Sequence, residues 1–370
     1  MQRFVWVWVV MVLVACSPRG EIVLAPPGAD LAPGRAIFLG TTRGPDPETG
    51  VPMTRGRLEH VAYAQFDVAV PPDRKPGDIR FTPKGAKPDP TRDFLTTSEQ
   101  FYPNAPAFRS DLARALRANG NEAVVFVHGY NNTLAEGMYR FAQLGHDLDL
   151  PGVLVHYSWP SMAHPLGYAY DRDSALFARD GFEDLLDQVT AAGARRIIIV
   201  AHSMGGALTM ETLRQIARSG KRGTLEHLAA VVLISPDLDV DVFRAQARAV
   251  GRLPEPFVIV TSQRDHALRL AARLSGETER LGNLQDLDRV ADLKVTMVEV
   301  GAFSVGDGHF TLGRSPALLA LLGQTGAMAA ALDGDQSTRA GLVPGVVLTV
   351  QQATRIVLAP VEQIATGLTN

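Results

Sequence analysis

The feature that most constrains the fold of this chain is a run of β-branched residues, followed by a serine that has a small residue two positions away on either side. Residues 197–200 indicate a buried strand of a parallel sheet, and a helical apolar pattern follows over residues 207–219. Ser203 stands at the sharp turn between them, where the backbone leaves no room for large neighbours two positions away. Ala201 and Gly205 occupy those positions, and alanine departs mildly from the usual glycine. The pattern predicts a nucleophile elbow, which lifts the serine hydroxyl above the sheet beside a helix N-terminus.

Two later loops supply an acid and a base in the chain order that such a serine requires. A predicted strand at residues 257–261 leads into a polar loop with Asp265, and one at residues 294–300 leads into a glycine-rich loop with His309. Ser203, Asp265 and His309 are therefore expected to meet at one edge of the sheet. There His309 would accept the serine proton, and Asp265 would hold the imidazole tautomer and stabilise the imidazolium.

Other aspartates leave alternatives open. Asp237 follows the strand before that of Asp265 and is a rival acid, and Asp307 is a weaker rival beside the histidine. We favour Asp265. Asp237, Asp239 and Asp241 also alternate as calcium ligands can, but the glycine and the bidentate glutamate of a calcium loop are missing, so we predict no metal site. We expect Asp237 near the active-site edge, or Asp239 as a helix cap.

With these parts in place, the chain resembles the α/β-hydrolase superfamily over about residues 36–323. Three segments carry the resemblance: VHGYN (127–131), HYSWP (156–160) and AHSMGG (201–206). They look like one bacterial branch of serine hydrolases, a domain-of-unknown-function group. The resemblance implies an α/β fold with a mostly parallel central sheet and helices on both faces. It implies no substrate, because esterases, lipases, thioesterases, amidases and peptidases share these features.

Hydrolases of this fold place an oxyanion donor in the loop that here follows the predicted strand at residues 123–127. The resemblance implies that the backbone N–H groups of Tyr130 and Met204 form the oxyanion hole. Gly129 would let the backbone approach the substrate closely. We interpret His128 as a residue that organises this loop and not as a second base.

Aromatic and amide side chains near these loops are further candidates. Tyr157 and Trp159 follow the predicted strand at residues 153–157 and, with Gly129, are the candidates for the substrate pocket; packing at a loop is the alternative for the two aromatic residues. Asn131 and Asn132 could cap the following helix or contact the substrate, and we favour capping.

The first sixteen residues have the pattern of a bacterial lipoprotein signal. Arg3 is followed by an unbroken apolar run at residues 4–14, which is too short to span a bilayer comfortably. The run ends in LVAC (13–16), which resembles a lipobox. Cys16, the only cysteine, would be acylated and anchor the chain in a membrane. Ser17 at the next position suggests, by resemblance to sorting in enteric bacteria, delivery to the outer membrane, facing the periplasm.

Composition divides the chain into four segments. We predict a signal peptide at 1–15, a flexible tether rich in proline, glycine and alanine at 16–35, the α/β-hydrolase domain at 36–323, and an apolar extension that packs on the domain at 324–370. The hydrophobic content of 46% supports a sizeable core.

Hydrophobic periodicity predicts several elements of the domain. We expect a first strand at 36–43, an antiparallel neighbour at 58–68 and a single crossover helix at 171–192, and residues 343–368 look helical. Only about twenty residues separate Ser235 from the next predicted strand, which excludes a large lid there.

The net charge of −3 and the lack of a basic patch exclude nucleic acid as an expected partner, and no phosphate loop or cofactor motif is present. The expected substrate is a small-molecule ester or a lipid, cleaved through an acyl-enzyme. An amidase or peptidase with the same triad, and a non-catalytic envelope lipoprotein that binds ligands on this fold, are the alternatives. The sequence leaves the oligomeric state open.

Overall fold

The computed structural model describes residues 19–220, 223–304, 308–316, 318–319 and 344–358. The predicted signal peptide, Cys16 and most of the predicted C-terminal extension lie outside the described residues. No helix in the described ranges is long and apolar enough to cross a membrane.

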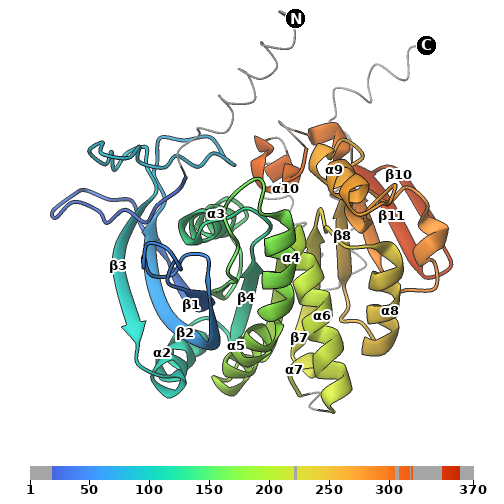
Figure 1. Ribbon diagram of the computed structural model, residues 1–370, viewed down its shortest axis with the longest axis horizontal. Coiled ribbons are helices and arrows are strands. Elements are labelled where there is room, and N and C mark those ends of the chain that lie inside the picture. Colours follow the sequence, from blue (N-terminus) through green and yellow to red (C-terminus); the bar gives the residue numbers. More distant parts are fainter. Residues whose placement is uncertain (1–18, 221–222, 305–307, 317, 320–343, 359–370) are drawn as a thin grey trace, which may run out of the picture.

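A mixed sheet of 11 strands, counted over the described residues, forms the centre of the molecule (Figure 1). Its strands are, in spatial order, β10 (Pro344–Val350), β11 (Ala353–Leu358), β9 (Thr296–Glu299), β8 (Phe257–Thr261), β7 (Leu228–Ile234), β6 (Arg196–His202), β4 (Glu122–Val127), β5 (Val153–Ser158), β1 (Gly34–Gly44), β2 (Gly56–Ala69) and β3 (Leu95–Tyr102). Neighbours from β11 to β1 run parallel, and antiparallel pairs close both edges. The predicted mostly parallel sheet is confirmed.

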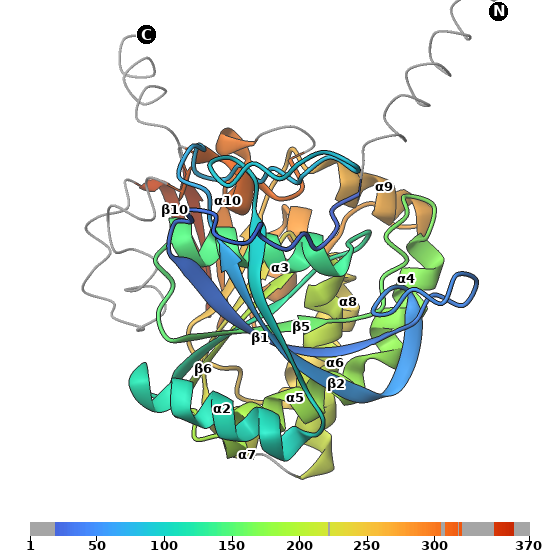
Figure 2. The same ribbon diagram turned by 90° about the vertical axis from the view of Figure 1, so that its left-hand side faces the viewer.

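Helices cover both faces of this sheet and create two cores. On one face pack α2 (Ala105–Ala118), α5 (Arg179–Ala191), α6 (Met204–Ser219) and α8 (Val240–Val250), and on the other α3 (Leu134–Asp147). Figure 2 shows α3 and α2 on opposite sides of the strands. Ile197 and Ile199 of β6 enter the first core, and Ile198 and Val200 enter the second. Because successive side chains point to opposite faces, a strand covered on both faces must be apolar throughout.

The smaller elements lie mainly at the ends of the sheet. They are α4 (Tyr168–Phe177), α7 (Gly223–Glu226), α9 (His266–Leu274), α10 (Thr311–Arg314) and three short 3-10 turns at Leu281–Asn283, Leu287–Val290 and Gly301–Phe303. Figure 1 shows α9 and α10 together at one end of the sheet. Only α8 and short loops connect β7 with β8, so the prediction of no large lid at this point is confirmed.

Two predicted helices are corrected by the structure. The crossover helix expected at 171–192 is broken at Ala178 into α4 and α5, and the buried Tyr157 hydroxyl donates to the Ala178 carbonyl at 2.6 Å. Residues 344–350 and 353–358, expected to be helix-like, form the strands β10 and β11. β11 pairs with β9, as Ile356 with Val298, and so extends the sheet. A short apolar run rich in β-branched residues suits a strand as well as a helix, and strand pairing decides here.

The segment expected to be a flexible tether is joined to the domain from residue 19 onward. The Thr96 N–H donates to the Val23 carbonyl at 2.9 Å, and the Ala25 N–H donates to the Thr96 carbonyl at 2.8 Å. The Val23 N–H also donates to the Tyr139 hydroxyl at 3.2 Å. This pairing at the end of β3 differs from the tether predicted for residues 16–35.

Two histidines are enclosed in the interior. The His156 ring of β5 stacks on Phe126 and lies tilted against Phe141, and its Nε2 has no hydrogen-bond partner among the described residues. Burial lowers the pKa of His156 to about 3. Burial, followed by the charge of Arg43, also holds the pKa of His128 well below its usual range. Both imidazoles are therefore neutral in the folded chain at neutral pH.

We expect these histidines to make the protein acid-sensitive. The unfolded chain binds protons at histidine below a pKa of about 6.5, whereas the buried rings do not, so stability falls as the pH drops below that value. Each ring contributes about 2 kcal/mol to the loss of unfolding free energy between pH 7 and pH 5. His156→Phe should remove that share, measured by urea unfolding at both pH values, whereas the exposed His60→Phe should not. An unchanged pH dependence in His156→Phe would contradict this account.

Candidate active site

The turn between β6 and α6 has the strained geometry of a nucleophile elbow. Ser203 adopts φ 52° and ψ −123°, a backbone conformation that residues other than glycine rarely take. A Cβ on Gly205 would lie 2.4 Å from the carbonyl oxygen of His128, so only glycine lets the helix approach the end of β4. Ala201 is fully buried beneath the turn. The structure thus explains both small neighbours of the serine.

Asp265 and His309 meet as predicted. Asp265 follows β8 as the N-cap of α9, and its Oδ1 accepts from the Leu268 N–H at 2.8 Å. Its Oδ2 lies 2.8 Å from His309 Nδ1. Asp265 is fully buried, and the His309 side chain is partly exposed. One carboxylate therefore caps the start of a helix and orients an imidazole through its Nδ1.

Ser203 meets this pair through its neighbour in the chain, His202. Ser203 is 1% exposed, and among the described residues its hydroxyl makes no hydrogen bond with His309. The ring of the preceding His202 lies 4.8 Å from the His309 ring, between centroids. Catalytic hydrogen bonds are often long in proteins without ligand and tighten when substrate binds.

The rival acid Asp237 has other partners. Its Oδ1 lies 3.1 Å from Arg280 Nε, and its Oδ2 accepts from the Tyr168 hydroxyl at 2.9 Å. Asp239 caps α8 by accepting from the Val242 N–H at 2.8 Å, as the sequence suggested. Asp307 lies outside the described residues. Of the two described candidates, only Asp265 contacts the histidine.

The loop after β4 and the start of α6 each offer one N–H group beside the serine. A Cβ built on Gly129 would lie 2.9 Å from the Ser203 Cβ, so the loop backbone rests against the elbow. In the part of the chain that the structure describes, the N–H groups of Tyr130 and Met204 donate to no protein group. These are the donors predicted for the oxyanion hole. Unpaired N–H groups beside a nucleophile can stabilise an oxygen that gains negative charge.

A buried arginine holds this loop in place. Arg43, at the end of β1, is 1% exposed. Its guanidinium contacts five groups: Ser158 Oγ at 2.7 Å, Asn132 O at 2.7 Å, Thr54 O at 3.0 Å, Ser161 O at 3.2 Å and His128 Nε2 at 3.2 Å. Burial lowers its pKa to about 10, so it stays charged at neutral pH. The role of Arg43 was not predicted, because an arginine at a strand end gives no local signal of it.

Asp171 of α4 supports the same loop from the other side. Its carboxylate accepts from the Asn131 N–H at 3.0 Å, the Met162 N–H at 2.6 Å and the Ser161 hydroxyl at 2.6 Å. Asn131 has φ 58°, a left-handed conformation that this contact helps to fix. The Tyr130 hydroxyl donates to the Pro165 carbonyl. The role of Asp171 was not predicted either.

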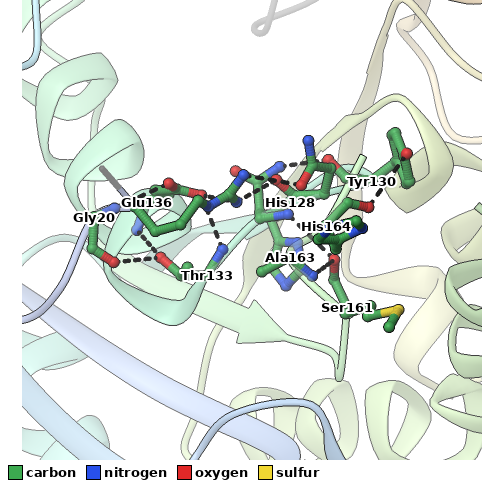
Figure 3. A network of polar contacts seen from close by, with 12 residues as sticks. Gly20, His128, Tyr130, Thr133, Glu136, Ser161, Ala163 and His164 are labelled. Carbon is green, nitrogen blue, oxygen red and sulfur yellow. Dashed lines mark hydrogen bonds and ion pairs between the residues drawn. The ribbon is translucent and has the colours of Figure 1, made fainter. Parts of the chain in front are cut away.

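The N-terminal segment completes the network. Arg19 donates to Asn131 Oδ1 at 2.9 Å and to Glu136 Oε2 at 2.5 Å. Gly20 contacts both Glu136 and Thr133, and Figure 3 shows these three residues on one side of His128, with Ser161 and His164 on the other. Thr133 and Glu136 form the capping box of α3. The expected capping by Asn131 or Asn132 is therefore wrong, because Thr133 is the N-cap.

Two cavities flank the elbow. One, of about 360 Å³, is lined by Gly129, Tyr130, His202 and His309 among others. The other, of about 260 Å³, is lined by Met204, Tyr168, Asp237 and Arg280 among others. His202, the residue before Ser203, lines the larger cavity, and Met204, the residue after it, lines the smaller one.

The predicted pocket residues divide between lining and core. Gly129 lines the larger cavity as expected. Tyr157 and Trp159 line neither cavity and are fully buried, which corrects the prediction. Tyr157 stacks on Phe182, and Trp159 stacks on His128 and donates to its carbonyl at 2.8 Å. Packing accounts for both aromatic residues, and His128 organises the loop as expected.

Comparison with known proteins supports the fold. The family described as "Alpha/beta hydrolase of unknown function (DUF900)" matches residues 104–322, more than half of the chain. The chain is similar to a cutinase-like protein from Cryptococcus sp., at 12% identity over 58% of this chain and 95% of that chain, with a TM-score of 0.35. It is also similar to Aspergillus fumigatus lipase B, at 16% identity over 56% and 52%, with a TM-score of 0.37. No curated protein matches. The family match confirms the predicted fold class.

Removing the Arg43 guanidinium should destabilise the protein strongly. Arg43→Met would leave several buried acceptors unpaired, and each unpaired group costs about 1–3 kcal/mol, so we expect the unfolding free energy to fall by about 3 kcal/mol or more. In Arg35→Met, the loss of an exposed pair with Asp149 should cost at most about 1 kcal/mol. Urea unfolding measures both, and equal losses would rule out the proposed support of the loop.

Proposed function

We propose that this chain, which belongs to the family of alpha/beta hydrolases of unknown function, is a serine hydrolase that cleaves carboxylic esters. Ser203 would be the nucleophile, His309 the base and Asp265 the acid. The observation that carries the proposal is the 2.8 Å contact between Asp265 and His309 beside the strained serine turn. A lone aspartate or histidine in a loop would mean little, whereas this pair at an elbow matches the parts of a triad.

The proposed reaction follows from these positions. The Ser203 oxygen attacks the ester carbonyl carbon while His309 Nε2 takes its proton, since Nδ1–H donates to Asp265. The N–H groups of Tyr130 and Met204 stabilise the oxyanion. His309 then protonates the leaving alcohol, which departs and leaves the acyl group on Ser203. Water, deprotonated by His309, releases the acid and restores the serine.

The ester assignment rests on the frequency of that chemistry in this fold, and an amide or peptide bond could undergo the same steps. A binding module without catalysis is the second candidate. The observation in its favour is that Ser203 is 1% exposed and lacks a hydrogen bond to His309 among the described residues. In a hydrolase, the hydrogen bond between Ser203 and His309 would form when substrate binds, and in a binding module it would not. A reactive serine is the direct sign of the hydrolase.

A fluorophosphonate probe tests for that serine. We expect the purified domain to be labelled and Ser203→Ala not to be. In Asp265→Asn, kcat for an activated ester should fall about 10⁴-fold, because asparagine favours the wrong tautomer of His309. Asparagine can still cap α9, and the matched control Asp239→Asn at the N-cap of α8 should keep its kcat. Absent labelling of the wild type would place the binding module first.

We further propose that the protein is a lipoprotein of the bacterial envelope, anchored at Cys16 in the outer membrane and facing the periplasm. The support is the lipobox-like LVAC segment after a short apolar run. Two or more acyl chains hold a protein on a membrane stably.

Cell fractionation tests this anchor. In a Gram-negative host, the full chain should sediment with the outer membrane, and Cys16→Ala should move it out of the outer-membrane fraction because no acyl chain can be attached. Ser203→Ala, which keeps the cysteine, should stay with the membrane. If Cys16→Ala fractionates like the wild type, acylation at this residue is not the anchor.

A further inference from the structure

Arginines outnumber carboxylates in the described lining of the larger cavity beside the proposed triad. Besides Gly129 and His309 its lining includes Arg19, Arg140 and Arg314, and among the described residues Glu136 is its one carboxylate. Glu136 is already bound by Arg19 and by the Thr133 N–H. Arg140 is the arginine of this lining whose contacts show no carboxylate partner among the described residues.

Arg140 of α3 is the centre of this charge. Its Nη1 donates to neutral oxygens only, those of Gly77 at 3.0 Å, Gln143 at 2.7 Å and Gly313 at 2.9 Å. Its guanidinium carbon lies 5.2 Å from the centroid of the Phe310 ring. Within the described ranges it forms no ion pair.

The nearby carboxylates form no ion pair with this arginine. Asp147, about two turns further along α3, is bound by Arg74 and by Gln143, and Asp147 and Asp78 favour the charged arginine only through their charges. Burial, with the charge of Arg314, lowers the pKa of Arg140 to about 9, so it remains a cation at neutral pH. A cation removed from water without a partner is costly, and an anionic ligand that reached it would offset that cost through charge-assisted hydrogen bonds.

We propose that this cavity binds substrates that carry a carboxylate or phosphate group, held by the guanidinium of Arg140 while the ester carbonyl lies against Ser203. The inference rests on the proposed function, since it names the substrate class of the same site. The cavity volume of about 360 Å³ suits a small molecule. Arginine binds both anions well because its planar donors match their oxygens.

Two esters of equal length test the proposal, the p-nitrophenyl monoester of glutarate, which is anionic, and p-nitrophenyl valerate, which is neutral. In Arg140→Gln we expect kcat/KM to fall about 10- to 100-fold for the anionic ester and little for the neutral one. Arg140→Lys, which keeps the charge, should retain part of the anionic rate. Arg109→Gln on α2, at the opposite face of the sheet, should affect neither ester. Equal losses for both esters in Arg140→Gln would overturn the proposal.

Inhibition of the wild type gives a readout that does not need a folded variant. At constant ionic strength, glutarate or inorganic phosphate should inhibit valerate ester hydrolysis competitively. Inhibition by glutarate alone assigns a carboxylate, and inhibition by phosphate alone assigns a phosphate. Inhibition by neither overturns the proposal.

Two further measurements separate this inference from the proposed function. Fluorophosphonate labelling of Ser203 without any anion effect would leave the hydrolase standing and remove the anion site. If labelling fails, a rise in Tm with phosphate or glutarate that Arg140→Lys retains and Arg140→Gln loses still supports the anion site. A Tm that neither anion raises in the wild type overturns it.

Discussion

The guanidinium of Arg43 is the contact on which the site geometry depends. It joins the ends of β1 and β5 to the loop after β4, and its partners lie 11 to 118 positions away in the chain. Four of the five are oxygen atoms and one is a ring nitrogen. A buried charge surrounded by dipoles is stable only if all of them are in place, because each unmade hydrogen bond is costly in the interior. The loop that presents Tyr130 to the serine therefore has one low-energy arrangement.

The residues of the candidate site that lie at strand ends could be predicted from the sequence. Ser203, Asp265 and His309 each follow a predicted strand, and parallel strands bring their carboxyl ends to one edge. Neighbouring residues set the strand and turn patterns, so these positions can be inferred locally. Arg43 binds groups up to 118 positions away, and Asp171 binds an N–H group 40 positions away. An isolated charge beside a strand or in a helix does not reveal such partners. Their roles need coordinates.

The predictions that were wrong, for two aromatic residues and for the C-terminal apolar run, also failed because of contacts with distant parts of the chain. Tyr157 near the end of β5 and Trp159 just after it lie toward the site edge, but their rings turn into the core, where Phe182 and His128 stack on them. The C-terminal apolar run became strands because the edge of β9 offers unpaired backbone groups that β11 satisfies. In each case a distant surface decided between two conformations that the local pattern allows.

The contacts of Arg19 with Asn131 and Glu136 limit how far the domain can lie from a lipid anchor at Cys16. Arg19 lies three positions after Cys16, and three fully extended residue steps reach at most about 10 Å. Arg19 lines the larger cavity and contacts the loop that carries Tyr130. A protein anchored at Cys16, as proposed, would thus hold the mouth of this cavity close against the lipid surface and in a restricted orientation. Molecules lying on that surface would meet the site far more often than molecules dissolved in the compartment.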